Sequence, residues 1–138
     1  MPKKILVIDD DETSIKFLQT RLEQNKYEVI TAHDGVSGLQ KVLQENPDLI
    51  ILDVEMPKMN GYTFMLEFKK LAELSLVPVI VLTAHEEMQP IFVLKGVRGY
   101  LVKPVKFEDL LEKLTVLFTS TQDGENPAPI KKTEGNNA

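Results

Sequence analysis

Four acidic residues stand together near the start of the chain, and their types and spacing suggest metal binding. They directly follow the apolar stretch KILVI at residues 4–8, and they are Asp9, Asp10, Asp11 and Glu12. Two like charges about 4 Å apart repel each other by roughly 4 kcal/mol at an effective dielectric constant of 20. A hard divalent cation such as Mg²⁺ relieves that repulsion, because it takes one or two carboxylates together with water and phosphate oxygens. The alternative is a capping cluster, in which the acids hold the first turn of the next helix.

Three further polar side chains stand at the ends of other apolar stretches. Asp53 ends LIILD, Thr83 ends PVIVLT, and Lys103 precedes Pro104 at the end of GYLVKP. Each has a simple structural interpretation, as a turn residue, a helix cap or an exit turn before proline. In a parallel sheet, however, ligands bind outside the carboxyl ends of the strands. If all these stretches are parallel strands, their carboxylates, hydroxyl and ammonium meet at one edge of the sheet.

The elements that would position these residues alternate regularly along the chain. Short apolar or β-branched stretches predict strands at residues 4–8, 27–32, 49–54, 77–84 and 99–104. Helical spacing of apolar residues, as in Ile15, Leu18 and Leu22, predicts a helix after the first strand. The later helices are expected at residues 35–46, 63–74, 90–96 and 107–118. A strand–helix unit repeated five times indicates an α/β fold with a doubly wound, five-stranded parallel sheet and helices on both faces.

The composition restricts the classes of function open to the chain. With 138 residues, 43% hydrophobic and 27% charged, it has the size and make-up of one globular domain. Its net charge of −5 argues against binding to nucleic acid or to an anionic membrane surface. The absence of cysteine excludes a disulfide, a thiolate nucleophile and a thiolate metal ligand. No apolar run approaches the roughly 20 residues of a membrane span, and MPKK at the start lacks the core of a signal peptide, so we expect a soluble cytoplasmic protein.

A change in composition marks the expected end of the domain. Residues 1–118 hold all the predicted elements, whereas residues 119–138 contain one large aliphatic side chain and no aromatic one. Such a segment buries too little apolar surface to offset the entropy that is lost on ordering. We therefore expect a disordered tail there, or the start of a linker.

Four stretches taken together resemble the successive motifs of the response-regulator receiver domain of two-component signalling. They are ILVIDDDE, LIILDVEMPKMNG, PVIVLTA and GYLVKP, and the match runs from Lys4 to Phe118. The stretch from Asp53 to Gly61 is highly specific in that context. The resemblance is to single-domain regulators of the chemotaxis type, and it implies a flavodoxin-like (βα)5 fold with strand order 2-1-3-4-5.

The resemblance also implies roles for individual residues. Asp53 falls on the aspartate that receives a phosphoryl group from the phosphohistidine of a histidine kinase or from a phosphotransfer protein. Asp9 and Asp10 fall on the acidic pair that holds Mg²⁺, together with Asp53 and the backbone carbonyl of Glu55. Lys103 falls on the lysine that pairs with the phosphoryl oxygens, and its bond to the following proline is expected to be cis.

Two further residues are implied in the response to phosphorylation. Thr83 falls on the hydroxyl that donates to the phosphoryl group, and Tyr100 on the aromatic residue that moves from an outward to an inward rotamer. The altered surface is expected to address a downstream protein target, and a phosphorylation-dependent dimer is one form of that response. By the same resemblance the chain is not an ordinary enzyme but a phosphoacceptor that assists its own phosphorylation and dephosphorylation.

The segment between Thr83 and Lys103 departs from the pattern of the family. It is slightly shorter than usual and contains Pro90, so we expect a fourth helix that is short or displaced. Because that helix belongs to the surface that meets partners in the family, a second function stays open. In this alternative the chain is a pseudo-receiver, an interaction module that is never phosphorylated.

Two classes of enzyme or carrier with similar sheets fit the sequence less well. A haloacid-dehalogenase-type phosphatase also forms an aspartyl phosphate, but it needs a second aspartate two residues later. This chain has Glu55 at that place, and its nucleophile follows the third strand instead of the first. A flavodoxin-like electron carrier needs a hydroxyl- and glycine-rich phosphate loop after the first strand, where this chain has acids.

Overall fold

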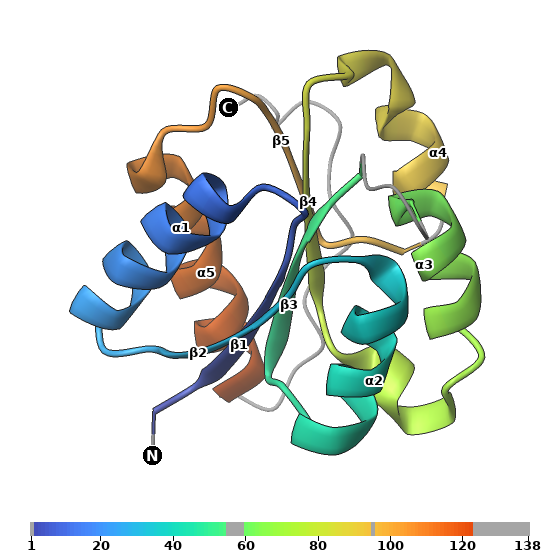
Figure 1. The fold of residues 1–138 in the computed structure, drawn as a ribbon, viewed down its shortest axis with the longest axis horizontal. Coiled ribbons are helices and arrows are strands. Elements are labelled where there is room, and N and C mark those ends of the chain that lie inside the picture. Colours follow the sequence, from blue (N-terminus) through green and yellow to red (C-terminus); the bar gives the residue numbers. More distant parts are fainter. Residues whose placement is uncertain (1, 55–59, 95, 123–138) are drawn as a thin grey trace.

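Five strands and five α-helices alternate along residues 2–54, 60–94 and 96–122, which are the residues that the computed structural model describes (Figure 1). The strands are β1 (Lys4–Ile8), β2 (Glu28–Ala32), β3 (Leu49–Asp53), β4 (Val79–Thr83) and β5 (Gly99–Val102). The helices are α1 (Glu12–Gln24), α2 (Gly35–Glu45), α3 (Gly61–Phe68), α4 (Gln89–Leu94) and α5 (Phe107–Gln122). Two 3₁₀ turns complete the described elements, η1 (Ala72–Leu76) and η2 (Glu86–Met88).

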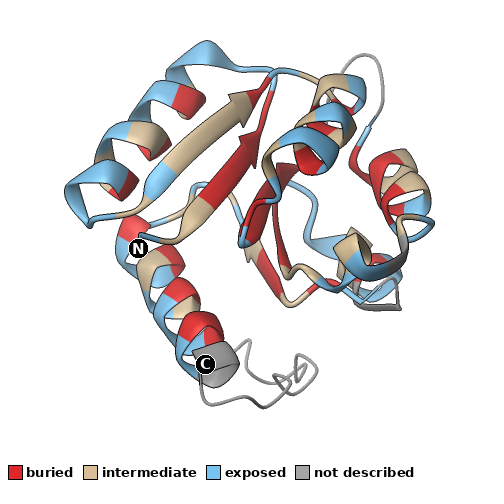
Figure 2. Ribbon diagram, turned by 90° about the horizontal axis from the view of Figure 1, so that it is seen from below, coloured by how far each residue is buried: buried red, intermediate tan, exposed pale blue. Residues whose placement is uncertain are grey.

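The strands form one parallel sheet in the order β2-β1-β3-β4-β5. Every residue of β3 and of β4 is buried, as the apolar composition of these stretches predicts for strands covered on both faces. The more polar β2 lies at the edge of the sheet and is only partly buried (Figure 2). The predicted fold class and strand order are therefore confirmed.

Helices cover both faces of the sheet and create two apolar layers. Figure 1 shows α1 and α5 on one face and α2, α3 and α4 on the other. Alternation along a strand sends successive side chains to opposite faces. In β1, Leu6 and Ile8 therefore join the layer beneath α2, α3 and α4, whereas Ile5 and Val7 pack under α1 and α5. Within the described part of the chain, no helix is both long enough and apolar enough to span a bilayer.

The ends of two helices differ from the sequence prediction. The third helix was predicted at residues 63–74, but α3 ends at Phe68 and the chain continues in tighter turns. In these turns Leu71 and Leu74 pack against the apolar layer beneath α2, α3 and α4, and the Leu74 N–H donates to the Leu71 carbonyl as in a 3₁₀ helix. The last helix instead runs four residues beyond its predicted end at Phe118, to Gln122. Phe118 is itself buried, so it holds the last predicted turn of the helix against the core. The helix continues past this residue instead of ending there.

The fourth helix is short, as the reduced segment length predicts. It has six residues, from Gln89 to Leu94, and follows directly on η2. Pro90 lies in its first turn, where the missing N–H of proline costs no intrahelical hydrogen bond. The remaining part of the predicted tail, residues 123–138, lies outside the described residues, so the domain boundary stays a prediction.

Gly61, the first residue of α3, is held against the end of β3. Its N–H donates to the Val54 carbonyl at 2.7 Å, and a Cβ atom there would lie 2.7 Å from the Val54 Cα atom. Because the clash is with backbone, we expect Gly61→Ala to lower the free energy of unfolding by about 1–3 kcal/mol. Urea denaturation followed by circular dichroism measures this, with Thr63→Ala in the same helical turn as the control. Equal urea midpoints for Gly61→Ala and the wild type would contradict the packing argument.

Candidate functional site

The carboxyl ends of four strands bring the predicted site residues to one edge of the sheet. Asp9 directly follows β1, Asp53 is the last residue of β3, and Thr83 is the last residue of β4. Lys103 follows β5, and its backbone N–H donates to the Thr83 carbonyl at 2.8 Å. The strands run parallel, so these ends meet as the sequence predicted.

The four acids after β1 do not share one role. Carboxylate oxygens of Asp9, Asp10 and Asp53 lie within 4.8 Å of one another. Asp11 instead caps α1, because its Oδ2 atom accepts from the backbone N–H of Ser14 at 3.3 Å and from the Ser14 hydroxyl at 2.7 Å. The metal interpretation therefore fits Asp9 and Asp10, and the capping interpretation fits Asp11.

Glu12, the fourth acid, pairs with His33, a residue outside the predicted site. Its Oε1 atom lies 2.8 Å from Nε2 of His33, which directly follows β2. Both side chains are more than half exposed, so the pair lies at the surface. Sequence spacing gave no signal for it, because the two residues meet only through the pairing of β1 with β2.

Lys103 makes the central polar contact of the site. Its Nζ atom donates to Oδ1 of Asp53 at 2.9 Å, and Asp53 is almost fully buried with 4% of its side chain exposed. The Lys103–Pro104 peptide bond is cis, as predicted. Asp9 is also buried, and its Oδ1 atom accepts from the backbone N–H of Asp11 at 3.0 Å.

Burial changes the acidity of both buried carboxyl groups. It raises the pKa of Asp53 from 3.8 to about 6; the hydrogen bond from Lys103 opposes this rise, and the neighbouring charge of Asp9 adds to it. Burial likewise raises the pKa of Asp9, against the lowering effects of the Asp11 N–H and of Lys103. The ammonium of Lys103 thus offsets part of the charge of three carboxylates, of which that of Asp10 is exposed. This oxygen-rich, negatively charged donor set fits a hard divalent cation such as Mg²⁺.

The raised pKa of Asp53 predicts a stability effect with a definite sign. In the folded chain Asp53 keeps its proton up to about pH 6, whereas the usual value is 3.8, so its favourable contribution at low pH is lost as the pH rises from 3.8 to about 6. The uncharged variant Asp53→Asn avoids this loss. In metal-free buffer at pH 7, we expect it to raise the free energy of unfolding by about 1–3 kcal/mol relative to the wild type, and the gain to vanish toward pH 4.

Urea denaturation at a series of pH values, with a chelator present, measures this difference. Glu112→Gln removes an exposed carboxylate from α5 and serves as the control. A difference between Asp53→Asn and the wild type that stayed constant from pH 4 to pH 7 would show that the buried carboxyl is not its source.

Thr83 and Tyr100 are linked through the backbone of His85. The Thr83 side chain is fully buried, and its Oγ1 atom accepts from the His85 N–H at 3.0 Å. The Tyr100 hydroxyl donates to the His85 carbonyl at 2.6 Å. Burial raises the pKa of Tyr100 to about 12, with smaller contributions from the charges of Glu87 and Glu86. A single residue after β4 therefore connects the hydroxyl of the site to the tyrosine of β5.

The orientation of Tyr100 differs from the prediction. The sequence resemblance implied an outward rotamer without phosphorylation, but the tyrosine is already buried, with 8% of the residue exposed. The physical reason is local: its hydroxyl finds a backbone acceptor, and its ring packs 6.2 Å from the ring of Phe92 in α4. Phosphorylation of this conformation would start from the inward rotamer.

One predicted ligand lies outside the described residues. The backbone carbonyl of Glu55, together with Pro57 and the two methionines of the motif, falls within residues 55–59. The structure therefore leaves that part of the predicted metal site as a prediction.

Comparison with known proteins identifies the family of this chain. The family model of the response regulator receiver domain matches residues 5–115. The chain belongs to this family. Among curated relatives of this receiver domain, the protein PilH of Pseudomonas aeruginosa is 34% identical over 83% of this chain and 97% of its own length. The transcriptional regulatory protein PhoP of Bacillus subtilis is 34% identical over 97% of this chain, but the match covers only 56% of that protein. The receiver domain thus spans about half the length of such longer regulators.

Solved structures of related receiver domains show the same fold. The chemotaxis protein CheY4 of Vibrio cholerae is 32% identical, with a TM-score of 0.78 over 83% of this chain and 98% of its own. The response regulator TrrA of Thermotoga maritima, solved in complex with Mg²⁺ and BeF, is 34% identical, with a TM-score of 0.74 over 82% of this chain and 96% of its own. Receiver domains are signalling domains that bind Mg²⁺ at an acidic pocket and interact with histidine kinases or phosphotransfer proteins and with downstream targets.

Proposed function

We propose that this receiver domain accepts a phosphoryl group on Asp53 and that the modification changes its surface toward a protein partner. The observation that carries the proposal is the contact between Lys103 and Asp53 at 2.9 Å, beside the acidic group formed with Asp9 and Asp10. A turn residue or a helix cap needs no such convergence from four strands. The phosphodonor is a phosphohistidine of a histidine kinase or of a phosphotransfer protein.

The chemistry assigned to Asp53 is nucleophilic attack. A carboxylate oxygen of Asp53 attacks the phosphorus atom, the bond from phosphorus to the donor imidazole nitrogen breaks, and an acyl phosphate forms on the aspartate. The electron pair of the broken bond stays with the imidazole. The carboxylate must be ionised to attack, so charges that counter the effect of burial on its pKa favour the reaction.

The surrounding residues hold the phosphoryl group and the metal. Lys103 would pair with a phosphoryl oxygen, and Thr83 would donate its hydroxyl proton to another. Mg²⁺ would be held by Asp10, Asp53 and the Glu55 carbonyl, with Asp9 acting through water. When bound, the cation supplies positive charge that neutralises the phosphoryl oxygens.

Labelling with a small phosphodonor tests this function directly. The full chain is incubated with acetyl phosphate, with Mg²⁺ or with a chelator, and its intact mass is measured. We expect one added phosphoryl group that is labile and that depends on Mg²⁺. No mass increase under either condition would favour the pseudo-receiver, which acts only through protein contacts.

The signal is expected to pass from the site to α4 through the backbone of His85. The His85 N–H donates to the Thr83 hydroxyl, and the His85 carbonyl accepts from the Tyr100 hydroxyl. Movement of the Thr83 hydroxyl toward a phosphoryl group would therefore alter both hydrogen bonds. We expect beryllofluoride with Mg²⁺ to shift the amide NMR signals of His85, Tyr100 and α4. Tyr100→Phe, which removes only the hydroxyl, should reduce the shifts in α4. Shifts confined to the loops that hold the acids would mean that this connection does not carry the signal.

A further inference from the structure

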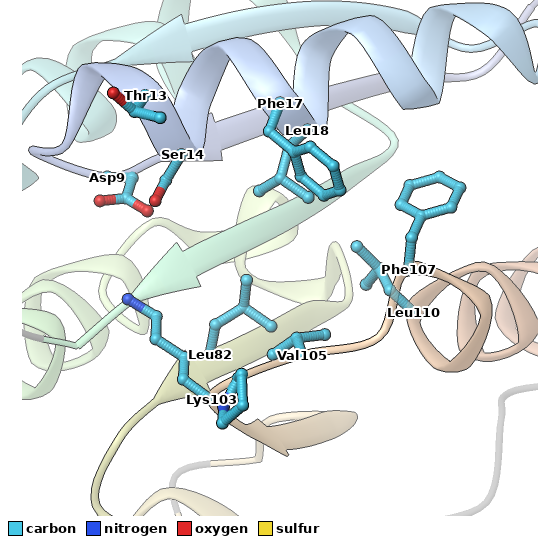
Figure 3. A pocket seen from close by; sticks show the side chains of 11 residues that line it. Asp9, Thr13, Ser14, Phe17, Leu18, Leu82, Lys103, Val105, Phe107 and Leu110 are labelled. Carbon is cyan, nitrogen blue, oxygen red and sulfur yellow. The ribbon is translucent and has the colours of Figure 1, made fainter.

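A pocket of about 640 Å³ lies between α1 and the segment that leads from β5 into α5 (Figure 3). Its apolar part is lined by Phe17, Leu18, Val105, Phe107 and Leu110. The apolar end stays open to solvent, because Phe17 is 49% exposed. Both the volume and the mainly apolar lining are those of a binding site for a ligand or a short peptide.

The two ends of the pocket differ in chemistry. Figure 3 shows Asp9 and Lys103 at one end and the rings of Phe17 and Phe107 at the other. The polar end includes Asp9, whose carboxylate lies within 4.8 Å of those of Asp10 and Asp53, and Lys103 balances part of this charge through its contact with Asp53. The pocket therefore suits a molecule with an apolar body and a positively charged head.

The chain itself contains a segment with this chemistry. Residues 127–132 read PAPIKK, so an apolar stretch with two prolines is followed at once by two lysines. Ile130 is the large aliphatic side chain of the region after Phe118. Proline-rich peptides suit apolar grooves, because their extended backbone loses little entropy on binding.

The course of α5 places this segment within reach of the pocket. The Phe118 ring lies 5.6 Å from the ring of Tyr27, which precedes β2, and 5.6 Å from the Nζ atom of Lys3, which precedes β1. The C-terminal part of α5 therefore lies at the amino ends of the strands, opposite the site. The helix rises about 1.5 Å per residue, so Phe107 lies roughly 22 Å back along it from Gln122. Extended chain between Gln122 and Ile130 spans about 25 Å. A chain that returns along α5 thus meets the apolar end first and the acids next, in the order of PAPI and KK.

We propose that residues 127–132 dock in this pocket, with Ile130 against Phe17 and Phe107 and with Lys131 and Lys132 toward the acidic group. A segment that cannot fold alone can still order against a preformed surface. The docked lysines and Mg²⁺ then compete for the same carboxylates, so each weakens the binding of the other.

A spin label on the segment tests the docking without any phosphorylation. The natural sequence has no cysteine, so Thr133→Cys in the full chain provides one attachment point for a nitroxide. We expect selective loss of the amide NMR signals of Phe17, Leu18 and Val105. The loss should disappear in the variant that also carries Ile130→Asp and Lys131→Glu, and it should persist with the conservative pair Ile130→Val and Lys131→Arg. Adding Mg²⁺ should weaken it.

Three outcomes would overturn the proposal. The first is signal loss confined to residues near the end of α5, such as Phe118. The second is signal loss unchanged by Ile130→Asp and Lys131→Glu. The third comes from a mixture of spin-labelled chain without isotope and isotope-labelled chain without the spin label. Broadening of the amide NMR signals of Phe17 and Val105 in that mixture would mean that the segment binds a second copy of the protein instead of the pocket of its own chain.

Discussion

Asp53→Asn is expected to abolish the gain of a phosphoryl group in the acetyl phosphate assay. The substitution keeps the size of the side chain and one oxygen, but it removes the ionised carboxylate that we propose attacks phosphorus. We expect no other carboxylate to take its place, because Asp53 is the acid of this group that accepts the 2.9 Å hydrogen bond from Lys103 and ends the strand between those of Asp9 and Thr83. Intact mass spectrometry of the treated chain measures the result.

The matched control is Asp48→Asn, which makes the same change just before β3, at the opposite end of that strand. Asp48 accepts from the backbone N–H of Lys4 and lies far along the strand from the site, so this variant should label like the wild type. Thermal unfolding shows whether Asp53→Asn is folded; in metal-free buffer at pH 7 we expect it to be more stable than the wild type, because it lacks the buried carboxyl. Stoichiometric, equally labile labelling of Asp53→Asn would show that another residue is the phosphoacceptor.

Asp10→Asn is expected to remove most of the dependence on Mg²⁺. In the wild type, we expect Mg²⁺ to bind the folded state and so to stabilise it by about 2.7 kcal/mol at 100 times its Kd. Loss of a carboxylate ligand should weaken metal binding by at least about tenfold, since even residues that merely orient ligands contribute that much. The melting temperature and the extent of labelling are both measured over a range of Mg²⁺ concentrations. The Mg²⁺ concentration needed for half of each response should rise in Asp10→Asn, by the same factor for both.

Asp11→Asn is the control for this experiment, because it removes the same charge from the next residue. Asparagine also caps helices well, and Asp11 serves as the cap of α1, so stability should change little. We expect the response of Asp11→Asn to Mg²⁺ to stay close to that of the wild type. Equal weakening in both variants would mean that the total negative charge of the cluster attracts the metal, and that Asp10 is not a specific ligand.

The sequence by itself determined the order of the elements and the edge of the sheet at which the site lies. Apolar stretches such as LIILD and VIVLT have the length and composition of doubly covered strands, and this signal is local. Parallel strands then place Asp53, Thr83 and Lys103 at one edge whatever the details of packing. The resemblance added the strand order, which no local pattern contains, and the structure has that order.

Only the tertiary structure decided how neighbouring residues of similar chemistry divide their roles. Asp9 and Asp11 look alike in the sequence, yet one is buried beside Asp53 and the other caps α1. The inward position of Tyr100 likewise depends on a carbonyl fifteen residues earlier. Such outcomes depend on which partner a side chain meets in space, because burial and hydrogen bonding are set by elements distant in the sequence. The end of α3 shows the same dependence: the helix stops at Phe68, and Leu71 and Leu74 beyond it pack against the core.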